Sequence, residues 1–177
     1  MKKYELTAEF IEKWGKKLFR IKALINFGSV EAGELGGYVE KEDNLAQDGD
    51  AWVCDDAEVC GNAEVCDNAR VYGNAEVYGN ARVCGNARVC GNADYLLIGR
   101  IGSRFSFTTF FKNKDKGITV SCGCFLGTIA EFRAKVTDTH GNNKHAKMYN
   151  LAADMAELQI LGEEHFDKLN TNKSEPF

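Results

Sequence analysis

The chain has 177 residues, a net charge of −4 and 44% hydrophobic residues, which is enough for one or two modest domains with a real core. This hydrophobic content excludes a wholly disordered chain, and no apolar run is long enough to span a bilayer. The residues after the basic start lack the apolar stretch of a secretory signal, so we expect a cytoplasmic protein without membrane contact.

The charge is distributed unevenly along the chain. Residues 1–27 carry a net charge of +4, residues 28–94 a net charge of −10 and residues 95–177 a net charge of +2. Because the acidic middle segment repels a phosphate backbone, we do not expect DNA or RNA to bind along it.

The N-terminal segment, residues 1–44, has the pattern of β-strands. In residues 17–25, three apolar side chains alternate with basic ones, which is typical of a half-buried strand. Residues 2–6 can pair with that strand, and the glycine-rich stretch at residues 33–40 then turns the chain toward the next segment. We therefore predict an N-terminal β cap.

A six-residue repeat occupies residues 45–94. After a degenerate unit at residues 45–50, seven units from Ala51 to Asn92 follow the pattern Ala-x-Val, then Cys or Tyr, Gly or Asp, and Asn or Asp. Ala and Val fall on one side of a short strand, and Gly-Asn tolerates the backbone angles of a tight corner. One unit cannot bury its apolar side alone, so we predict that the units stack as a β-solenoid.

This repeat resembles the hexapeptide-repeat family, whose members form left-handed β-helices with three strands per turn. Three segments, Arg20-Ile-Lys-Ala-Leu, Gly36-Gly-Tyr-Val-Glu and Asn44-Leu-Ala-Gln-Asp-Gly-Asp-Ala-Trp-Val, also look like an uncharacterised group of phage and prophage hexapeptide proteins. The resemblance implies a mainly β fold, namely a left-handed β-helix with an N-terminal β cap and a small C-terminal α+β module. It also implies a phage-encoded protein that acts in the host cytoplasm.

With three units per turn, residues eighteen apart lie on adjacent strands about 4.8 Å apart. Like charges stacked so closely repel each other, and the basic face of one subunit against the acidic face of another would offset this. We therefore expect a homo-oligomer, most simply a trimer; in the alternative, both faces are only solvated. The residues of these two faces are Trp52, Arg70 and Arg88 on one side and Glu58, Glu76 and Asp94 on the other.

Five of the seven cysteines occupy the fourth repeat position, where Tyr72 and Tyr78 also occur. A position that accepts Cys or Tyr suits a medium, partly apolar side chain, so we expect no disulfide there. Cys122 and Cys124 form a C-x-C pair, but zinc needs two further ligands, for which His140 and His145 are the candidates. We favour buried structural thiols and predict no metal site.

The pattern of residues 95–161 predicts an α+β module. Residues 162–177 are polar and aperiodic, and we expect them to form a weakly docked tail. The stretch Val120-Ser-Cys-Gly-Cys-Phe-Leu-Gly-Thr resembles a module attached to varied phage proteins. Thr128 and Glu131 have the spacing of a capping box, which starts a helix. The predicted elements are strands at 95–101, 104–112 and 118–122 and helices at 128–139 and 144–161, the last with Leu151, Met155, Leu158 and Leu161 on one face.

We expect the C-terminal module to be the binding end, because it holds nine basic and five acidic side chains between residues 95 and 161. The predicted helix start after Gly127 adds free backbone N–H groups, which suit an anion. In the alternative interpretation, these are solvated charges over an ordinary aromatic core. The candidate ligand-binding residues are Arg100, Arg104, Lys112, Thr128 and Arg133.

The best-known activity of the hexapeptide family is acyl transfer. The resemblance implies that this activity would need a histidine base near the solenoid. None of His140, His145 and His165 lies in the repeats, so we predict no catalytic residue and no cofactor. We expect a non-catalytic, oligomeric binding protein of phage type that sequesters an anionic, nucleotide-like signal of antiviral defence. The alternatives are a protein that docks onto a host or viral protein as an inhibitor or scaffold, and an acyltransferase that uses His140 or His145.

Overall fold

The computed structural model describes residues 1–164 and divides the chain into two compact units, unit 1 (Met1–Asn92) and unit 2 (Ala93–Phe177). The boundary falls two residues before the predicted end of the repeat segment at residue 94. Residues 165–177, with most of the predicted tail, lie outside the described part. None of the helices in residues 1–164 is both long and apolar enough to cross a membrane.

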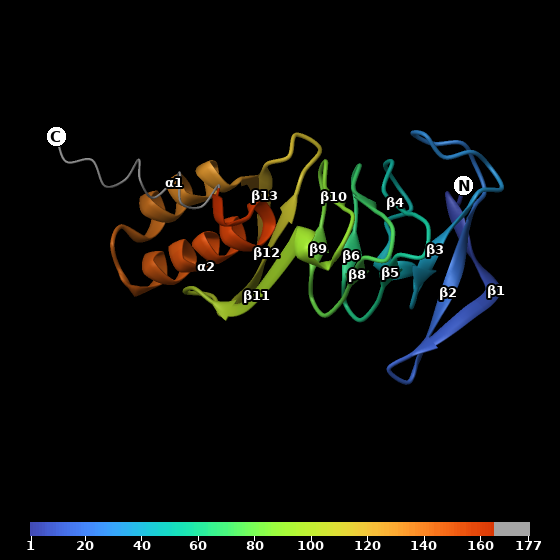
Figure 1. The fold of residues 1–177 in the computed structure, drawn as a ribbon, viewed down its shortest axis with the longest axis horizontal. Coiled ribbons are helices and arrows are strands. Elements are labelled where there is room, and N and C mark those ends of the chain that lie inside the picture. Colours follow the sequence, from blue (N-terminus) through green and yellow to red (C-terminus); the bar gives the residue numbers. More distant parts are fainter. Residues whose placement is uncertain (165–177) are drawn as a thin grey trace. The chain divides into compact units, whose positions relative to one another are not determined.

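The expected mainly β solenoid class is wrong. The described chain is a mixed α/β structure with four small separate sheets and two α-helices, and none of these sheets is closed or forms a solenoid sheet (Figure 1). The physical reason lies in the repeat corners. From Asp55 to Gly85, the fifth residue of six successive units has a positive φ, between 53° and 72°. Each extended segment therefore ends after two residues, which leaves short, separate ladders instead of one continuous sheet.

An antiparallel hairpin begins unit 1. Strands β1 (Tyr4–Lys13) and β2 (Lys16–Ala23) pair along their length, and β3 (Leu35–Val39) adds to β2 in antiparallel orientation. The predicted strand at 17–25 and its pairing with the N-terminal residues are confirmed, although β1 extends well beyond residue 6. Strand β3 pairs in parallel with the repeat strand β5, which joins the hairpin to the repeats.

The repeat region, residues 51–92, contributes seven two-residue strands that pair in parallel. The predicted register of eighteen residues is confirmed, because β4 pairs with β7, β7 with β10, β5 with β8 and β6 with β9. Every Ala and Val of the pattern is at most 1% exposed, so these small side chains form the interior. The strands are β4 (Trp52–Val53), β5 (Glu58–Val59), β6 (Glu64–Val65), β7 (Arg70–Val71), β8 (Glu76–Val77), β9 (Arg82–Val83) and β10 (Arg88–Val89), flanked by the short 3₁₀ helices η1 (Glu42–Asn44) and η2 (Asn92–Asp94).

The N-terminal segment covers part of the repeat region. Trp52 is fully buried between the rings of Tyr4 and Phe27, at centroid distances of 6.2 and 5.4 Å. The buried amine of Lys3 donates to the main-chain oxygens of Asp48, Gly49 and Ala51. Burial lowers the pKa of Lys3 to about 8. The predicted cap is therefore tied to the repeats by both ring packing and hydrogen bonds.

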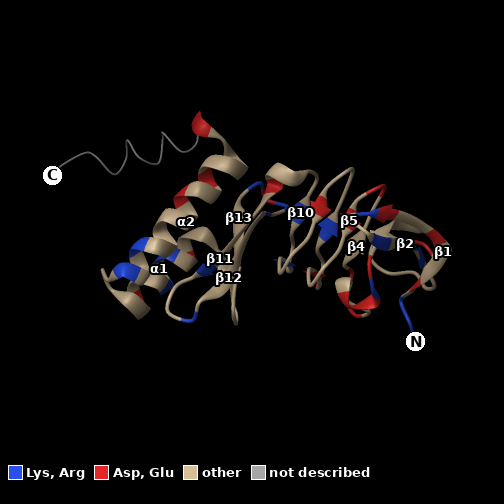
Figure 2. Cartoon of the chain, turned by 90° about the horizontal axis from the view of Figure 1, so that it is seen from below, with Lys and Arg blue, Asp and Glu red and all other residues tan. Residues whose placement is uncertain are grey.

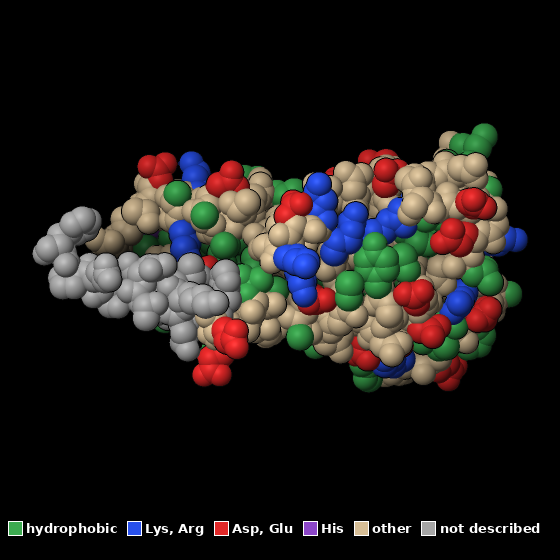
Figure 3. Space-filling view, turned by 45° about the horizontal axis from the view of Figure 1, so that its top comes forward, with side chains coloured by type: hydrophobic (Ala, Val, Ile, Leu, Met, Phe, Trp, Pro, Cys, Tyr) green, Lys and Arg blue, Asp and Glu red, His purple; other side chains and the backbone are tan. Residues whose placement is uncertain are grey.

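The two stacked charge faces are satisfied within the chain. The Lys13 amine, at the end of β1, lies 2.6 Å from the Glu58 carboxylate and 2.7 Å from that of Glu76, which offsets the repulsion between them. On the other face Arg70 is buried, and the Arg88 guanidinium donates to main-chain oxygens. Figure 3 shows Lys and Arg side chains gathered on one face of this region. These contacts reduce the repulsion within each face, and the expected pairing of the two faces between subunits stays a prediction.

One expectation about the repeat cysteines is wrong, because Cys66 and Cys84 form a disulfide. They occupy the fourth position of units eighteen residues apart, directly after the paired strands β6 and β9, and their Cα atoms are 4.7 Å apart. The occurrence of Tyr at this position indicates only how large a side chain the position accepts. The eighteen-residue register decides which side chains are neighbours, and it places the sulfur atoms of Cys66 and Cys84 together.

Unit 2 is a four-stranded antiparallel sheet with two helices. The strands β11 (Tyr95–Ile101), β12 (Ser106–Lys112), β13 (Ile118–Cys122) and β14 (Phe125–Thr128) lie in sequence order, followed by α1 (Ile129–His140) and α2 (Lys144–Leu161) (Figure 1). The predicted helices and the Thr128 capping box are confirmed. Sequence analysis missed β14, because it follows β13 after only two residues, Gly123 and Cys124. The core between sheet and helices centres on Phe110, Val120, Phe132 and Tyr149.

Helix α2 buries a different face from the one that its large apolar residues suggest. Ala152, Ala153 and Ala156 are buried, because small side chains let the helix approach its neighbours closely. The large residues form an exposed stripe, with Met148 39%, Leu151 64%, Met155 57% and Leu158 45% exposed. We call these four residues the α2 stripe.

Candidate ligand-binding cavity

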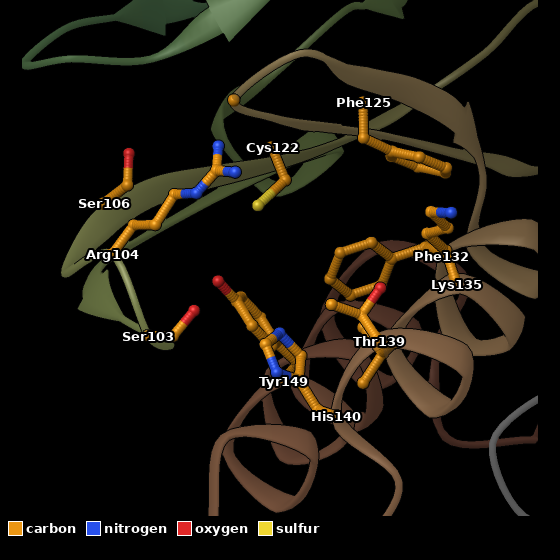
Figure 4. Close-up of a pocket in the computed structure, with 12 residues that line it drawn as sticks. Ser103, Arg104, Ser106, Cys122, Phe125, Phe132, Lys135, Thr139, His140 and Tyr149 are labelled. Carbon is orange, nitrogen blue, oxygen red and sulfur yellow. The ribbon is translucent and has the colours of Figure 1, made fainter.

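Unit 2 contains an open cavity of about 380 Å³ between the β11–β12 loop, the start of the β13–β14 turn and the two helices. Figure 4 shows the Arg104 guanidinium, the Cys122 thiol and the Tyr149 hydroxyl directed toward the same space. The remaining lining residues are Ser103, Ser106, Gly123, Phe125, Phe132, Lys135, Val136, Thr139 and His140.

The loop between β11 and β12 brings Arg104 to the cavity. Gly102, at the loop start, has a φ of +73°, and a Cβ at this position would overlap the Tyr149 hydroxyl. Only glycine meets both conditions, since it adopts this backbone region without strain and leaves room for the ring. The sharp turn therefore places the next residues, Ser103 and the exposed Arg104, on the cavity rim.

A short chain of polar contacts leads from the core to the cavity. The Thr108 hydroxyl donates to the Cys122 sulfur at 3.2 Å, and Cys122 in turn interacts with the Tyr149 hydroxyl. Burial, and then the neighbouring Cys122, raise the pKa of Tyr149. The phenol therefore stays protonated at neutral pH and can donate a hydrogen bond to an acceptor in the cavity.

Helix α1 forms another wall and supplies basic and aromatic groups. His140, its last residue, stacks on the Tyr149 ring at a centroid distance of 5.8 Å and an angle of 25°. Lys135 lies five residues earlier on the rim, with its amine 3.9 Å from the exposed Asp138 carboxylate. Phe132 packs edge-on against Tyr149 and is tilted against Phe125, which gives the cavity an aromatic side.

These groups define what the cavity can hold. Arg104 and Lys135 can neutralise an anion, and a guanidinium suits the paired oxygens of a phosphate or carboxylate. Phe125 and Phe132 offer an apolar surface to a ring. Ligand sites commonly combine mostly apolar walls with a few directed polar groups, in volumes of about 300–1,000 Å³.

Of the five residues predicted to bind a ligand, Arg104 alone lines the cavity. Lys112 is 3.1 Å from Asp94, and Arg133 is 2.8 Å from Asp154 and 2.7 Å from Glu157, so both cations have partners within unit 2. Arg100 is an exposed residue of β11.

The predicted anion site at Thr128 is occupied by the protein itself. The Glu131 carboxylate accepts from both the backbone N–H and the hydroxyl of Thr128, each at 2.8 Å. These bonds lower the pKa of Glu131, so the carboxylate stays charged over the helix start and competes with an external anion there.

Sequence analysis missed Lys135, His140 and Tyr149 as cavity residues. Tyr149 and His140 lie on different helices, and the turn between them decides that their rings stack. Their sequence signals, a helix-ending His and a helical Tyr on an apolar face, also occur in ordinary cores. No local pattern distinguishes the two cases.

The alternative zinc ligands, Cys122 and Cys124 with His140 and His145, do not form a close group of ligand atoms in residues 1–164. Within this described part, the group whose ligand atoms lie close enough to hold an ion is Cys66, Asp67 and Cys84 in unit 1.

No protein-family model matches the chain, and no curated protein sequence matches it either. The resemblance to phage hexapeptide proteins therefore has no support from these comparisons and stays a prediction.

Proposed function

We propose that unit 2 binds a small anionic ligand with a planar ring, such as a nucleotide-like signal, and that the protein acts as a non-catalytic binding protein. The observation that carries this proposal is the cavity itself, in which Arg104 and Lys135 stand on the rim of a space with an aromatic side. If the chain is phage-encoded, sequestering a defence signal in the host cytoplasm is a role that this cavity would serve.

The two kinds of wall make separate contributions. The Arg104 guanidinium would hold the anionic group, with the Tyr149 hydroxyl as a further donor. The ring would lie against Phe125 and Phe132. In proteins that bind single-stranded nucleic acids, stacking of a base on an aromatic side chain contributes about 1–3 kcal/mol. A ligand with only one of these features should therefore bind more weakly than one with both.

Isothermal titration of the full chain with AMP, ribose 5-phosphate and adenosine tests this proposal. We expect AMP to bind more tightly than either fragment, and Arg104→Ala to weaken AMP binding about tenfold or more, since a charge-assisted hydrogen bond contributes roughly 1.5–3 kcal/mol. The control variant Lys114→Ala removes an exposed cation in the β12–β13 turn, outside the cavity. Equal affinities of the Arg104→Ala variant and the wild-type protein would reject the site.

A second proposal concerns oligomerisation, and the α2 stripe supports it. The four residues follow a 3-4-3 spacing, which forms a continuous seam on one side of a helix. We propose that a second copy of the chain covers this seam, with the two α2 helices antiparallel. In that orientation Lys144 and Lys147, at the helix start, approach Glu163 and Glu164 beyond the end of the partner helix. Figure 2, which colours the ribbon by residue type, shows basic residues at one end of α2 and acidic residues toward the other. This arrangement gives a dimer, whereas the trimer expected from the charged faces stays a separate prediction.

The expected dimer is weak. Each stripe residue is about half exposed, so its burial contributes about 1 kcal/mol, or roughly 8 kcal/mol over the eight side chains of a dimer. Association costs about 4–15 kcal/mol in lost freedom, so the sum predicts a concentration-dependent dimer. Sedimentation at several concentrations should show dissociation by Leu151→Glu/Met155→Glu, while Leu126→Glu, an exposed β14 residue, serves as the matched control. An unchanged mass distribution in the double variant would contradict the proposal.

A further inference from the structure

The fourth position of the repeat forms three columns, and these columns differ in one respect. With eighteen-residue stacking, Cys54, Tyr72 and Cys90 form one column, and Cys60 and Tyr78 form a second. In the third column, Cys66 and Cys84 stand directly beside each other, immediately after β6 and β9. Two sulfur atoms therefore meet at adjacent levels of this column, whereas a tyrosine follows the first cysteine in the other two.

A carboxylate lies against this sulfur pair. One ligand atom of Asp67 and the two sulfur atoms all lie within 4.8 Å of one another. Asp67 has a φ of +59°, and its Oδ2 atom accepts from the Gly85 N–H at 2.9 Å, so the corner holds the carboxylate in place. Cys66 and Cys84 are 7% and 2% exposed, whereas Asp67 is exposed, which leaves one side open to an ion.

We infer that Cys66, Cys84 and Asp67 form a redox-gated site for Zn²⁺. In the disulfide form both sulfur atoms are bonded to each other and the site is closed. In the reduced form two thiolates and a carboxylate are the donors that Zn²⁺ prefers, and water can complete four-coordination from the exposed side. The inference concerns unit 1 and does not depend on the cavity in unit 2.

The geometry of the strands suits this coordination. Two thiolates on a tetrahedral zinc ion, each about 2.3 Å from it, stand about 3.8 Å apart. The Cα atoms of Cys66 and Cys84 are 4.7 Å apart, so rotation of the side chains can open the sulfur atoms to that distance without moving the strands. Three negative ligands against a double positive charge also leave a net charge of only −1 at an exposed corner.

The reaction that opens the site balances with a phosphine reductant and water. The phosphine attacks one sulfur and breaks the S–S bond, and water then supplies the oxygen of the phosphine oxide. The two electrons from the phosphine and two protons from water leave two thiols. When Zn²⁺ binds, it displaces the two thiol protons.

The chain contains a matched control for the role of the carboxylate. Asp55 also has a positive φ, and its Oδ2 accepts from the Gly73 N–H at 2.9 Å, as Asp67 does from Gly85. The column beside Asp55, however, offers Tyr72 next to Cys54 instead of a second thiol. The hydrogen bond from the glycine eighteen residues later is thus a structural feature of both corners, and the sulfur pair distinguishes the proposed site.

The test uses the full chain, reduced with tris(2-carboxyethyl)phosphine, freed of reductant under argon and titrated with Co²⁺ and then Zn²⁺. We expect one Co²⁺ per chain with thiolate charge-transfer absorption, displaced by Zn²⁺, and no such absorption in the disulfide form. Cys66→Ser and Cys84→Ser should weaken Zn²⁺ binding at least 100-fold, and Asp67→Asn about tenfold. Cys54→Ser and Asp55→Asn should bind Zn²⁺ like the wild-type chain.

Two results would overturn the inference. One is Zn²⁺ binding of equal strength in the Cys66→Ser/Cys84→Ser chain, which would place the metal on other thiols. The other is equal binding by the reduced and the disulfide forms of the wild-type chain. Because this second comparison uses a single sequence, it remains decisive even if the serine variants fail to fold.

Discussion

The ion pair between α1 and α2 allows a quantitative test of what holds unit 2 together. The Arg133 guanidinium bridges Asp154 and Glu157 and also contacts the main-chain oxygen and side-chain Oδ1 of Asn150. Glu157 is a buried residue, so its carboxylate depends on this partner. We predict that Arg133→Met, which keeps the apolar stem but removes the charge, destabilises unit 2.

The size of the effect follows from the burial of the partners. Removing one member of a fully buried pair costs about 3–5 kcal/mol, because a buried charge is left unpaired. Arg133 and Asp154 are partly exposed, so solvent screens part of the charge and we expect a loss of about 2–3 kcal/mol. The double variant Arg133→Met/Glu157→Leu removes both charges and should recover most of this loss, since an apolar pair of similar volume often replaces a buried ion pair without cost.

Two spectroscopic signals separate the units in this experiment. Both tryptophans, Trp14 and Trp52, lie in unit 1, while α1 and α2, the α-helices of the described chain, lie in unit 2. During urea unfolding of the full chain, helical ellipticity should shift to lower urea in Arg133→Met, whereas tryptophan fluorescence should not. If the helical midpoint were unchanged, or if the double variant were less stable than the single one, the reasoning about the buried carboxylate would be refuted.

Two further predictions concern Lys3 and Thr128. Burial holds the pKa of Lys3 at about 8 in the folded chain, against 10.5 in the unfolded chain, so between these values the unfolded state binds more protons and stability rises with pH. Between pH 8 and 9.5 this should add about 1.5 kcal/mol to the stability of unit 1, measured by tryptophan fluorescence in urea, and Lys3→Met should remove the dependence. Thr128→Ala should destabilise the helices by about 1 kcal/mol through loss of the cap, in the same unfolding assay. It should leave AMP affinity unchanged by titration, and weaker AMP binding in this variant would restore the helix start as an anion site.

The candidate site was only partly accessible to sequence reasoning. A basic composition identified unit 2 as a candidate binding end, but it does not show which cations are already paired. Lys112 and Arg133 have acidic partners that are 18 to 24 residues away in the sequence, and such pairs depend on how strands and helices pack. Arg104 lines the cavity because Gly102 turns the loop beneath Tyr149, a contact between residues 47 apart.

The sequence by itself determined the local and periodic features of this protein. The six-residue period sets which side of each short strand carries Ala and Val, so the buried positions and the eighteen-residue register follow from it. The start of α1 is equally local, because the Thr128 capping box involves residues three apart.

The tertiary structure alone decided the fold class, the buried face of α2 and the cavity. The tight corners follow from Gly and Asp in the repeat, but only the structure shows that they leave separate two-residue ladders instead of one continuous sheet. The alanines of α2 pack inward and leave the larger Leu and Met residues exposed, because close helix packing favours small side chains. These features depend on contacts between residues that are far apart in the sequence. The pattern of one segment therefore does not show which of these contacts form.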